Sequence, residues 1–425
     1  MITAKAFAGK HYAVLGLARS GLATVEALLA SGAKVTAWDD KEEARAKASP
    51  GVELDDFVGG DLSRFDSVVV TPGLPLYRHP IAQRAAKAGV EIIGDIELFA
   101  RARPELPPHK VVGITGTNGK STTTALIHHI LRTAGVPTEM GGNIGLPILA
   151  QDPLPESGVY VLELSSYQID LSNSLDCDVA VLLNITPDHL DRYDSFEAYA
   201  ASKSRLFEMQ SPGHLAVVDY RAEADEDVLQ EAEDPIIQFI DDVEIGDQSA
   251  WPSLQGPHNR QNAAAALATC QTLGLSLSQV EQGLRTYPGL PHRMERVAEK
   301  DGVLFINDSK ATNPTATAPA LAAFPQIRWI LGGQAKTDNL DECAPHFSHV
   351  VKAYTIGEAA EMFASLLSPH MDVAQCVTLD EAVRTAASEA KAGETVLLSP
   401  ACASFDQFRD FEARGDAFRD LVGGL

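Results

Sequence analysis

Short apolar runs alternate with longer amphipathic stretches along most of the chain, and this alternation predicts an α/β protein. The runs are rich in Val, Ile and Leu and are bounded by Gly, Pro, Asn or Asp, as buried strands are. Strands are predicted at residues 12–15, 34–38, 67–70, 111–114, 159–162, 179–183, 303–306, 328–331, 350–356 and 395–399. Helices are predicted between them, among others at residues 22–30, 121–131 and 196–207. Functional residues are expected at the carboxyl ends of the strands, where open α/β sheets bind ligands.

Two Pro-rich segments divide this pattern into three parts. One covers residues 103–108 and precedes a strand, and the other covers residues 287–291. A chain of 425 residues is also too long for one core, and about 150 residues per domain suggests about three domains. We predict domains at residues 1–98, 99–289 and 290–425.

Charge and composition narrow the possible classes of function. The formal net charge is −24, which argues against nucleic-acid binding because a phosphate backbone needs a basic face. The five cysteines are far apart and form no C-x-x-C pair, which fits reduced thiols better than disulfides or a zinc site. No apolar run approaches about 20 residues and no signal-like start precedes the first strand. We therefore expect a cytoplasmic protein without membrane insertion.

A Gly-rich turn after the fourth predicted strand has the composition of a phosphate-binding loop. The sequence G-T-N-G-K-S-T spans residues 116–122 and leads directly into a predicted helix. Backbone N–H groups and the positive end of the helix dipole would point at one place, where Lys120 would add a cation and Ser121 a ligand for Mg²⁺. The strict P-loop spacing would require Gly where Ile114 stands. The loop is therefore a shortened variant, or else an ordinary turn with a surface lysine.

A second Gly-rich turn, G-L-A-R-S-G at residues 16–21, follows the first predicted strand. Asp39 ends the next strand about 20 residues further on, as in dinucleotide-binding units, but Ala18 replaces the middle Gly of that motif. The turn could bind a dinucleotide, the pyrophosphate of a UDP-sugar, or no ligand. The loop at residues 71–73 ends the third strand at the same expected edge.

Three further side chains in the central part are candidates for chemistry. Glu163 ends a predicted buried strand, where a carboxylate could hold Mg²⁺ or could simply be solvated. His189 follows the next strand, and on its own such a histidine is more often structural than a ligand. Lys203 lies in the predicted helix at residues 196–207, and by itself it would be expected to face solvent.

Eight sequence blocks follow one another along the chain: G-T-N-G-K-S-T (116–122), G-G-N-I-G (141–145), L-E-L-S-S-Y-Q (162–168), T-P-D-H-L-D-R-Y (186–193), G-P-H-N-R-Q-N (256–262), G-L-P-H-R-M-E (289–295), N-D-S-K-A-T-N (307–313) and S-P-A-C-A-S-F-D-Q-F (399–408). In this order and spacing they resemble the Mur ligases over the whole chain. The resemblance implies a Rossmann-like N-terminal domain, a central P-loop ATPase-like α/β domain and a C-terminal Rossmann-like α/β domain. Within the family, the last two blocks resemble those of the member that adds D-glutamate.

The resemblance implies an ATP-dependent amide ligase of peptidoglycan synthesis. ATP would phosphorylate the carboxylate of UDP-N-acetylmuramoyl-L-alanine, and the amine of D-glutamate would displace phosphate. A monomer is expected. Two rivals belong to other classes: an NAD-dependent oxidoreductase built on the first Gly-rich turn, and a non-catalytic nucleotide-binding switch. Within the ligases, a different amino acid or a folate-type acceptor is the nearest alternative.

The resemblance also assigns residues to each ligand. For ATP they are Gly116, Thr117, Asn118, Gly119, Lys120, Ser121, Thr122, Asn259, Asn262, Arg293 and Asp308. For Mg²⁺, of which two ions are expected, they are Ser121, Glu163, His189 and Lys203, the last as a carbamate. For the UDP-substrate they are Arg19, Ser20, Asp39, Thr71, Pro72, Gly73, Asn143 and His189. For D-glutamate they are Lys310, Thr312, Lys336, Ser404 and Phe411. The implied catalytic set is Lys120, Glu163, His189 and Lys203.

Three details qualify these assignments. Ala18 departs from the Gly-rich pattern at the diphosphate, and Gln334-Ala335 stands where the family often has an acidic residue and Gly. Ser404 and Gln407 also have the spacing of a capping box. We expect both roles for Ser404, because the N-terminus of a helix is itself an anion site.

Overall fold

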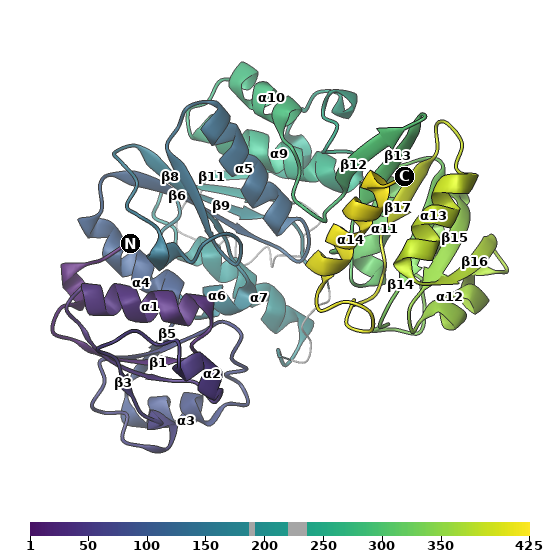
Figure 1. The fold of residues 1–425 in the computed structure, drawn as a ribbon. Helices are drawn as coiled ribbons and strands as arrows, with labels where there is room; N and C mark the ends of the chain where they lie inside the picture. Colours follow the sequence, from purple (N-terminus) through teal and green to yellow (C-terminus); the bar gives the residue numbers. More distant parts are fainter. Residues whose placement is uncertain (187–191, 220–235) are drawn as a thin grey trace. The chain divides into compact units, whose positions relative to one another are not determined.

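The computed structural model describes residues 1–186, 192–219 and 236–425, and the strands among them form three sheets (Figure 1). The predicted α/β class is confirmed. The chain divides into two compact units. Unit 1 consists of Met1–Glu244 and Ala264–Gly283, and unit 2 consists of Ile245–Ala263 and Leu284–Leu425. The boundaries of the three expected domains stay a prediction.

The N-terminal sheet of unit 1 is entirely parallel, in the order β3-β2-β1-β4-β5. Its strands are β1 (His11–Leu15), β2 (Lys34–Trp38), β3 (Glu53–Leu54), β4 (Ser67–Val70) and β5 (Glu91–Ile93). The helices of this part are α1 (Arg19–Ala30), α2 (Glu42–Arg45), α3 (Pro80–Ala88) and α4 (Asp95–Ala102). β2 and β4 begin and end at the predicted residues. This strand order matches the first five strands of the Rossmann order 3-2-1-4-5-6.

The middle sheet of unit 1 is also parallel, in the order β11-β10-β9-β6-β8-β7. Its strands are β6 (His109–Thr115), β7 (Thr138–Gly142), β8 (Gly158–Glu163), β9 (Val179–Leu182), β10 (Leu215–Val218) and β11 (Ile236–Phe239). The helices in this stretch are α5 (Lys120–Thr133), α6 (Ser166–Asp170) and α7 (Phe196–Glu208), followed by α9 (Pro257–Thr272) and α10 (Leu277–Thr286). The register pairs Ile114 with Glu163 and Thr115 with Leu182. The carboxyl ends of β6, β8 and β9 therefore meet at one edge.

One apolar core joins the two sheets of unit 1. It contains Val14 and Phe99 from the N-terminal part and Val111 and Tyr160 from the middle part, all at most 1% exposed. The Phe99 and Tyr160 rings meet edge to face with their centroids 5.1 Å apart. Burying each such side chain contributes roughly 1.5–3 kcal/mol. The two sheets therefore form one packed body.

The C-terminal sheet lies in unit 2, in the order β12-β13-β17-β14-β15-β16. Its strands are β12 (Glu295–Lys300), β13 (Val303–Asn307), β14 (Ile327–Gly332), β15 (Val350–Ile356), β16 (Asp372–Val377) and β17 (Thr395–Leu398). The helices are α11 (Pro314–Ala322), α12 (Ala360–Leu367), α13 (Leu379–Glu389) and α14 (Phe411–Gly423). Only the pairing of β12 with β13 is antiparallel among the described strands. β15 has the predicted bounds.

The first helix starts earlier than predicted. α1 begins at Arg19 instead of residue 22, so Gly21 lies within its first turn. A Cβ on Gly21 would lie 1.9 Å from the Gly16 carbonyl oxygen. The missing side chain therefore allows the helix to start directly against the preceding turn.

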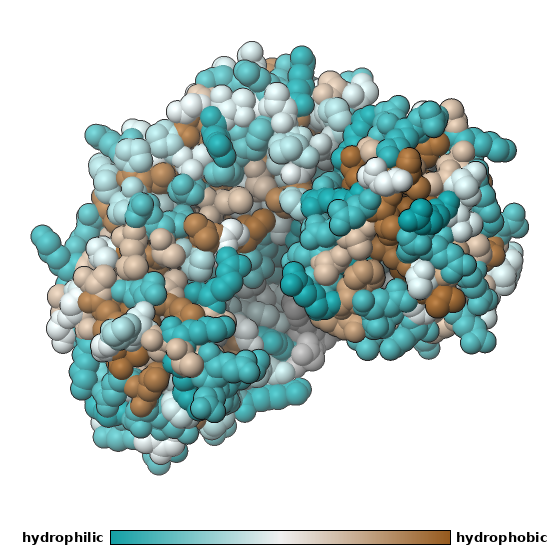
Figure 2. Space-filling model, viewed as in Figure 1, coloured by the Kyte–Doolittle hydropathy of each residue, from teal (hydrophilic) through white to brown (hydrophobic). Residues whose placement is uncertain are grey.

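No helix among the described residues is long and apolar enough to cross a membrane. Figure 2 shows small apolar groups among a mostly hydrophilic surface on the face that it presents.

Candidate functional site

The phosphate loop connects β6 to α5 and has the conformation that its glycines allow. Gly116 and Gly119 have φ of +142° and +86°. The Lys120 ammonium Nζ donates to the carbonyls of Gly116 and Thr117, both at 2.8 Å. Because α5 begins at Lys120, the N–H groups of its first turn point at the place where a phosphate would sit. The loop can therefore cradle an anion.

Asn184, which the sequence analysis did not single out, fixes the loop from the end of β9. Its carbonyl accepts from the Thr117 N–H at 2.8 Å, and its side-chain Oδ1 accepts from the Asn118 N–H at 2.8 Å. The Asn184 amide in turn donates to the Asn118 carbonyl at 3.1 Å. The sequence could have indicated Asn184, because it follows a predicted buried strand whose carboxyl end is expected beside the Gly-rich turn.

Glu163 lies at the same edge, as expected, and is 2% exposed. Its Oε1 accepts from Asn143 Nδ2 at 2.9 Å, and its carbonyl accepts from the Asn143 N–H at 2.8 Å. Its Oε2 is buried without a hydrogen-bond partner. A buried carboxylate oxygen without a donor is suited to a cation, so this residue fits Mg²⁺.

The described residues contain no cluster of three or more His, Cys, Asp or Glu that could hold a metal by themselves. Mg²⁺ commonly binds through one or two carboxylates and the phosphates of a substrate. Glu163 and the Ser121 hydroxyl, which is on the first turn of α5, fit that pattern. His189, the expected ligand of a second ion, lies outside the described residues.

Lys203 is buried on α7 and does not face solvent. Its side chain is 2% exposed, and Nζ donates to the Gly116 carbonyl at 3.1 Å. The ammonium also lies 4.6 Å from the centre of the Tyr199 ring. The expectation drawn from Lys203 alone was wrong, because α7 packs this face against the phosphate loop.

The N-terminal sheet brings its candidate residues to one edge. Asp39 accepts from the Leu17 N–H at 2.7 Å and from the Lys41 N–H at 2.9 Å, so it holds the Gly-rich turn. A Cβ on Gly16 would lie 2.4 Å from Thr71 Oγ1. Arg19 donates to the Gly145 carbonyl at 2.6 Å, which links this edge to the loop that carries Asn143. Ser20 lies beside Arg19 in the first turn of α1.

A pocket of about 180 Å³ adjoins the loop at residues 71–73. Pro72, Leu74, Tyr77 and Tyr167 line its apolar wall. Arg192 reaches into the same region: its guanidinium lies 4.4 Å from the centre of the Tyr167 ring and donates to the Gly73 carbonyl at 3.2 Å. Arg192 belongs to the block T-P-D-H-L-D-R-Y at residues 186–193, and no role was predicted for it.

In unit 2, Asp308 follows β13 and is buried. Its Oδ1 accepts from the Met294 N–H at 3.1 Å, and its Oδ2 accepts from Ser399 Oγ at 2.8 Å. Burial raises the pKa of Asp308 to about 7, against the lowering effect of these bonds and of Arg293. Asp308 and Arg293 therefore lie in the same unit, near enough to interact electrostatically.

Asn259 and Asn262 of α9 belong to the same unit. They are 3% and 2% exposed, and Asn262 Nδ2 donates to Asn259 Oδ1 at 3.1 Å. Asn259 also donates to the Gln255 carbonyl at 2.9 Å. The two expected adenine-side residues thus form one buried pair.

Four of the residues expected at D-glutamate occupy loops that follow β13, β14 and β17, and the fifth, Phe411, begins α14. Lys310 Nζ lies 4.1 Å from the centre of the Phe411 ring, and Lys336 Nζ donates to Thr312 Oγ1 at 3.4 Å. Ser404 is 2% exposed. Cations and hydroxyls so placed can hold two carboxylates.

The expected capping box at Ser404 is wrong. No helix begins there; α14 begins at Phe411, and the Asp410 carboxylate caps it by accepting from the Ala413 N–H at 2.7 Å. Residues 404–408 form a turn in which the N–H groups of Gln407 and Phe408 donate to the Ser404 carbonyl. The S-x-x-Q spacing does form a capping box elsewhere, at Ser165 and Gln168.

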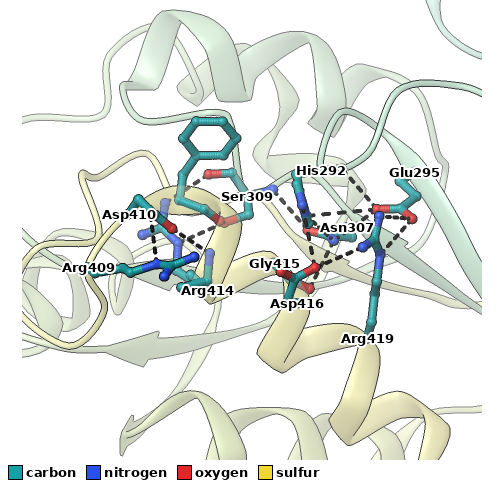
Figure 3. A network of polar contacts seen from close by, with 12 residues as sticks. His292, Glu295, Asn307, Ser309, Arg409, Asp410, Arg414, Gly415, Asp416 and Arg419 are labelled. Carbon is teal, nitrogen blue, oxygen red and sulfur yellow. Dashed lines mark hydrogen bonds and ion pairs between the residues drawn. The ribbon is translucent and has the colours of Figure 1, made fainter. Parts of the chain in front are cut away.

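Arg414 joins the loops of this candidate acceptor site, and no sequence signal had pointed to it (Figure 3). It is 1% exposed and donates to oxygen atoms of Ser309, Gly332, Cys402 and Ala403, at distances of 2.9 to 3.4 Å. Burial lowers the pKa of Arg414 to about 10. One cation thus holds the end of β14 and the segments that follow β13 and β17.

Comparisons with known proteins identify the family of the chain. The family model described as Mur ligase middle domain matches residues 114–251. The model described as Mur ligase, glutamate ligase domain, matches residues 292–402, and the Mur ligase MurD-like N-terminal domain matches residues 10–94. The matched ranges include the phosphate loop, Glu163 and most of the residues expected at D-glutamate.

Two curated relatives are similar over their full length. A UDP-N-acetylmuramoylalanine–D-glutamate ligase of Novosphingobium aromaticivorans is 60% identical, and the match covers 100% of this chain and 97% of that protein. A ligase of the same name from Sphingopyxis alaskensis is 58% identical, with 100% of both chains covered. Among solved structures, the MurF ligase of Thermotoga maritima in complex with ADP has a TM-score of 0.61 at 17% identity, covering 99% of this chain and 97% of that one. This last similarity concerns the fold.

Proposed function

The chain belongs to the Mur ligase family, and from this premise we propose that it joins D-glutamate to UDP-N-acetylmuramoyl-L-alanine in peptidoglycan precursor synthesis. ATP is converted to ADP and phosphate in the same reaction. The similarity that carries this proposal is the 60% identity, over the whole chain, to a ligase named for D-glutamate. The enzyme acts as a monomer in the cytoplasm, on small-molecule substrates and without nucleic acid.

The first step makes the acyl donor reactive. A carboxylate oxygen of the substrate bonds to the γ-phosphorus of ATP, and the bond from that phosphorus to the β-phosphate oxygen breaks, which releases ADP. Lys120 and the N–H groups at the start of α5 neutralise charge on the phosphates. Asn143 holds the substrate side and also orients Glu163, to which it donates at 2.9 Å.

The second step forms the amide. The D-glutamate nitrogen bonds to the acyl carbon, the bond from that carbon to the phosphate oxygen breaks, and the nitrogen loses a proton. Lys310, Lys336 and Ser404 orient the amino acid through its two carboxylates, with Thr312 and Phe411 beside them. Arg293 and Asp308 bind the ATP nucleotide.

Mg²⁺, when bound, would neutralise phosphate charge in the first step. Ser121, Glu163 and a carbamylated Lys203 would hold it, together with His189. A free lysine with a pKa near 10.4 would repel the ion, whereas a carbamate offers anionic oxygens. The buried position of Lys203 beside the phosphate loop supports this assignment.

The carbamate can be tested by mass. In bicarbonate buffer at neutral pH, native intact-mass measurement is expected to find the protein heavier by one CO₂, and acid should remove the addition. Lys203→Gln should abolish both the addition and most of the turnover. Lys110→Gln, at an exposed lysine of β6, should leave both unchanged. An addition that persists in Lys203→Gln would contradict the assignment.

The proposed reaction is tested by phosphate release with ATP, Mg²⁺ and UDP-N-acetylmuramoyl-L-alanine. D-glutamate, L-glutamate, L-alanine or a diamino acid is added in turn. We expect turnover with D-glutamate alone. Turnover with another amino acid would keep the ligase chemistry but reject the roles given to Lys310, Lys336 and Ser404.

A further inference from the structure

A buried histidine precedes β12 in a backbone conformation that few side chains adopt. His292 has φ of +61° and is 5% exposed. Residues other than Gly are uncommon in this region and persist where their surroundings over-determine them. His292 directly precedes Arg293, which the proposed function places at the nucleotide.

Several hydrogen bonds hold His292. Its N–H donates to Glu295 Oε2 at 2.9 Å, and its carbonyl accepts from the Lys310 N–H at 3.0 Å. Asn307 Nδ2 donates to the ring nitrogen Nδ1 at 3.0 Å. Burial lowers the pKa of His292, which favours the neutral ring that this bond requires. The residue is therefore tied at once to β12, to β13 and to the loop that carries Lys310.

Helix α14 also packs against His292, through Gly415 (Figure 3). A Cβ on Gly415 would lie 2.1 Å from His292 Nδ1 and 2.8 Å from its Cγ. Gly415 also accepts from Asn307 Nδ2 at 3.1 Å through its carbonyl. One turn further along, Arg419 pairs with Glu295 at 2.7 Å. The helix therefore meets the histidine and its partners over two successive turns.

Gly415 is unfavourable for the helix itself. Gly in a helix interior is less stable than Ala, and Gly415 has none of the positive φ values that would require a glycine. The space that the imidazole occupies explains why a glycine stands at this position. Glycine at position 415 is therefore required by the space that the His292 ring fills, and the backbone conformation of α14 does not require it.

We infer that Gly415 is a positioning residue: the absence of its side chain seats His292, and the seated His292 sets the positions of Arg293 and Lys310. Arg293 is bonded covalently to His292, and Lys310 is bound to its carbonyl. The inference rests on the proposed function, in which Arg293 binds ATP and Lys310 binds D-glutamate. α14 thereby supports both ligands, since Arg414, next to Gly415, holds the loops around Ser404.

The test compares two changes in the same helix. Gly415→Ala adds a methyl group against His292, whereas Gly423→Ala adds one that meets nothing within 4 Å. We expect Gly415→Ala to lower kcat/KM for ATP and for D-glutamate by about tenfold to a hundredfold, because small misplacements of binding groups have such effects. Direct binding of the UDP-substrate, measured by calorimetry, should change less than about twofold, since its residues lie in unit 1. Gly423→Ala should change none of these values.

A second background separates positioning from general damage. His292→Gly removes the imidazole and accepts a positive φ, so adding Gly415→Ala to it should have no further effect. An equal effect of Gly415→Ala in both backgrounds would overturn the inference, as would kinetics equal to those of Gly423→Ala. If Gly415→Ala alone does not fold, the double variant must fold and match His292→Gly. An unfolded double variant would also overturn the inference.

The nucleotide measurement keeps this inference apart from the proposed function. Affinity for a non-hydrolysable ATP analogue is measured without any amino acid, and it should fall in Gly415→Ala but not in Gly423→Ala. Absence of turnover with D-glutamate in the unaltered enzyme would reject the proposed function. If Gly415→Ala and Gly423→Ala bind the ATP analogue with equal affinity, the positioning role of Gly415 is rejected.

Discussion

Glu163→Gln is expected to lower turnover roughly a thousandfold, because the proposed function makes Glu163 a ligand of Mg²⁺. A metal ion supplies several kcal/mol of charge stabilisation, and each 1.36 kcal/mol is tenfold in rate. The folded protein should be at least as stable as before. Glutamine keeps an acceptor for Asn143, and it removes a buried charge whose Oε2 has no hydrogen-bond donor. Phosphate release over a range of Mg²⁺ concentrations measures the first effect, and urea unfolding without ligands measures the second.

A matched control is available at Glu97, a buried carboxylate with a complete set of donors. It accepts from the N–H groups of Asn173 and Ser174, from Ser174 Oγ and from Arg101, at 2.7 to 2.9 Å. Glu97→Gln should lower the free energy of unfolding by about 1–3 kcal/mol because donors lose their acceptors, and should leave kcat nearly unchanged. A Glu163→Gln enzyme that keeps its turnover would contradict the role of Glu163.

Arg414→Met should have the largest effect on stability. The substitution leaves the carbonyls of Ser309, Gly332 and Cys402 without the guanidinium donor in a buried site, whereas the Ala403 carbonyl keeps the Gln334 N–H. Each orphaned group costs about 1–3 kcal/mol, so we expect a loss of at least about 3 kcal/mol in the free energy of unfolding. The loops that carry Lys310, Lys336 and Ser404 would also shift. Urea unfolding and the KM for D-glutamate measure the two consequences.

The control for Arg414 is an exposed arginine. Arg384 on α13 is 62% exposed in its side chain and pairs with Asp380 on the same helix. Arg384→Met should change the free energy of unfolding by about 0.5 kcal/mol or less. A KM for D-glutamate that is unchanged in a folded Arg414→Met enzyme would show that the loops hold their positions without the guanidinium.

The sequence predicted the parts of the fold that local chemistry decides. β2, β4 and β15 have the expected bounds because β-branched and apolar runs between turn residues have few alternatives. The phosphate loop and Glu163 were predictable because strand, turn and helix follow one another in the chain. The residues of the first Gly-rich turn alone leave a dinucleotide, a UDP-sugar or no ligand open, and its assignment to the UDP-substrate stays a prediction.

The rest depends on contacts between distant segments. Lys203 looks like a surface lysine in its own helix, and only packing of α7 on the phosphate loop buries it. Arg414 is one charged position in an amphipathic helix, and its acceptors come from loops 11 to 105 residues away. The Ser404 spacing predicted a helix start, but Asp410 caps α14 instead.

The order of segments in the two compact units has a consequence for biosynthesis. Residues Ile245–Ala263 belong to unit 2, yet the ribosome makes them before Ala264–Gly283, which belong to unit 1. Domains generally fold as units during synthesis, the N-terminal one first. Here the N-terminal unit is complete only after a piece of the next has emerged. Residues Ile245–Ala263 can pack against the rest of unit 2 only after β12 to β17 have been translated.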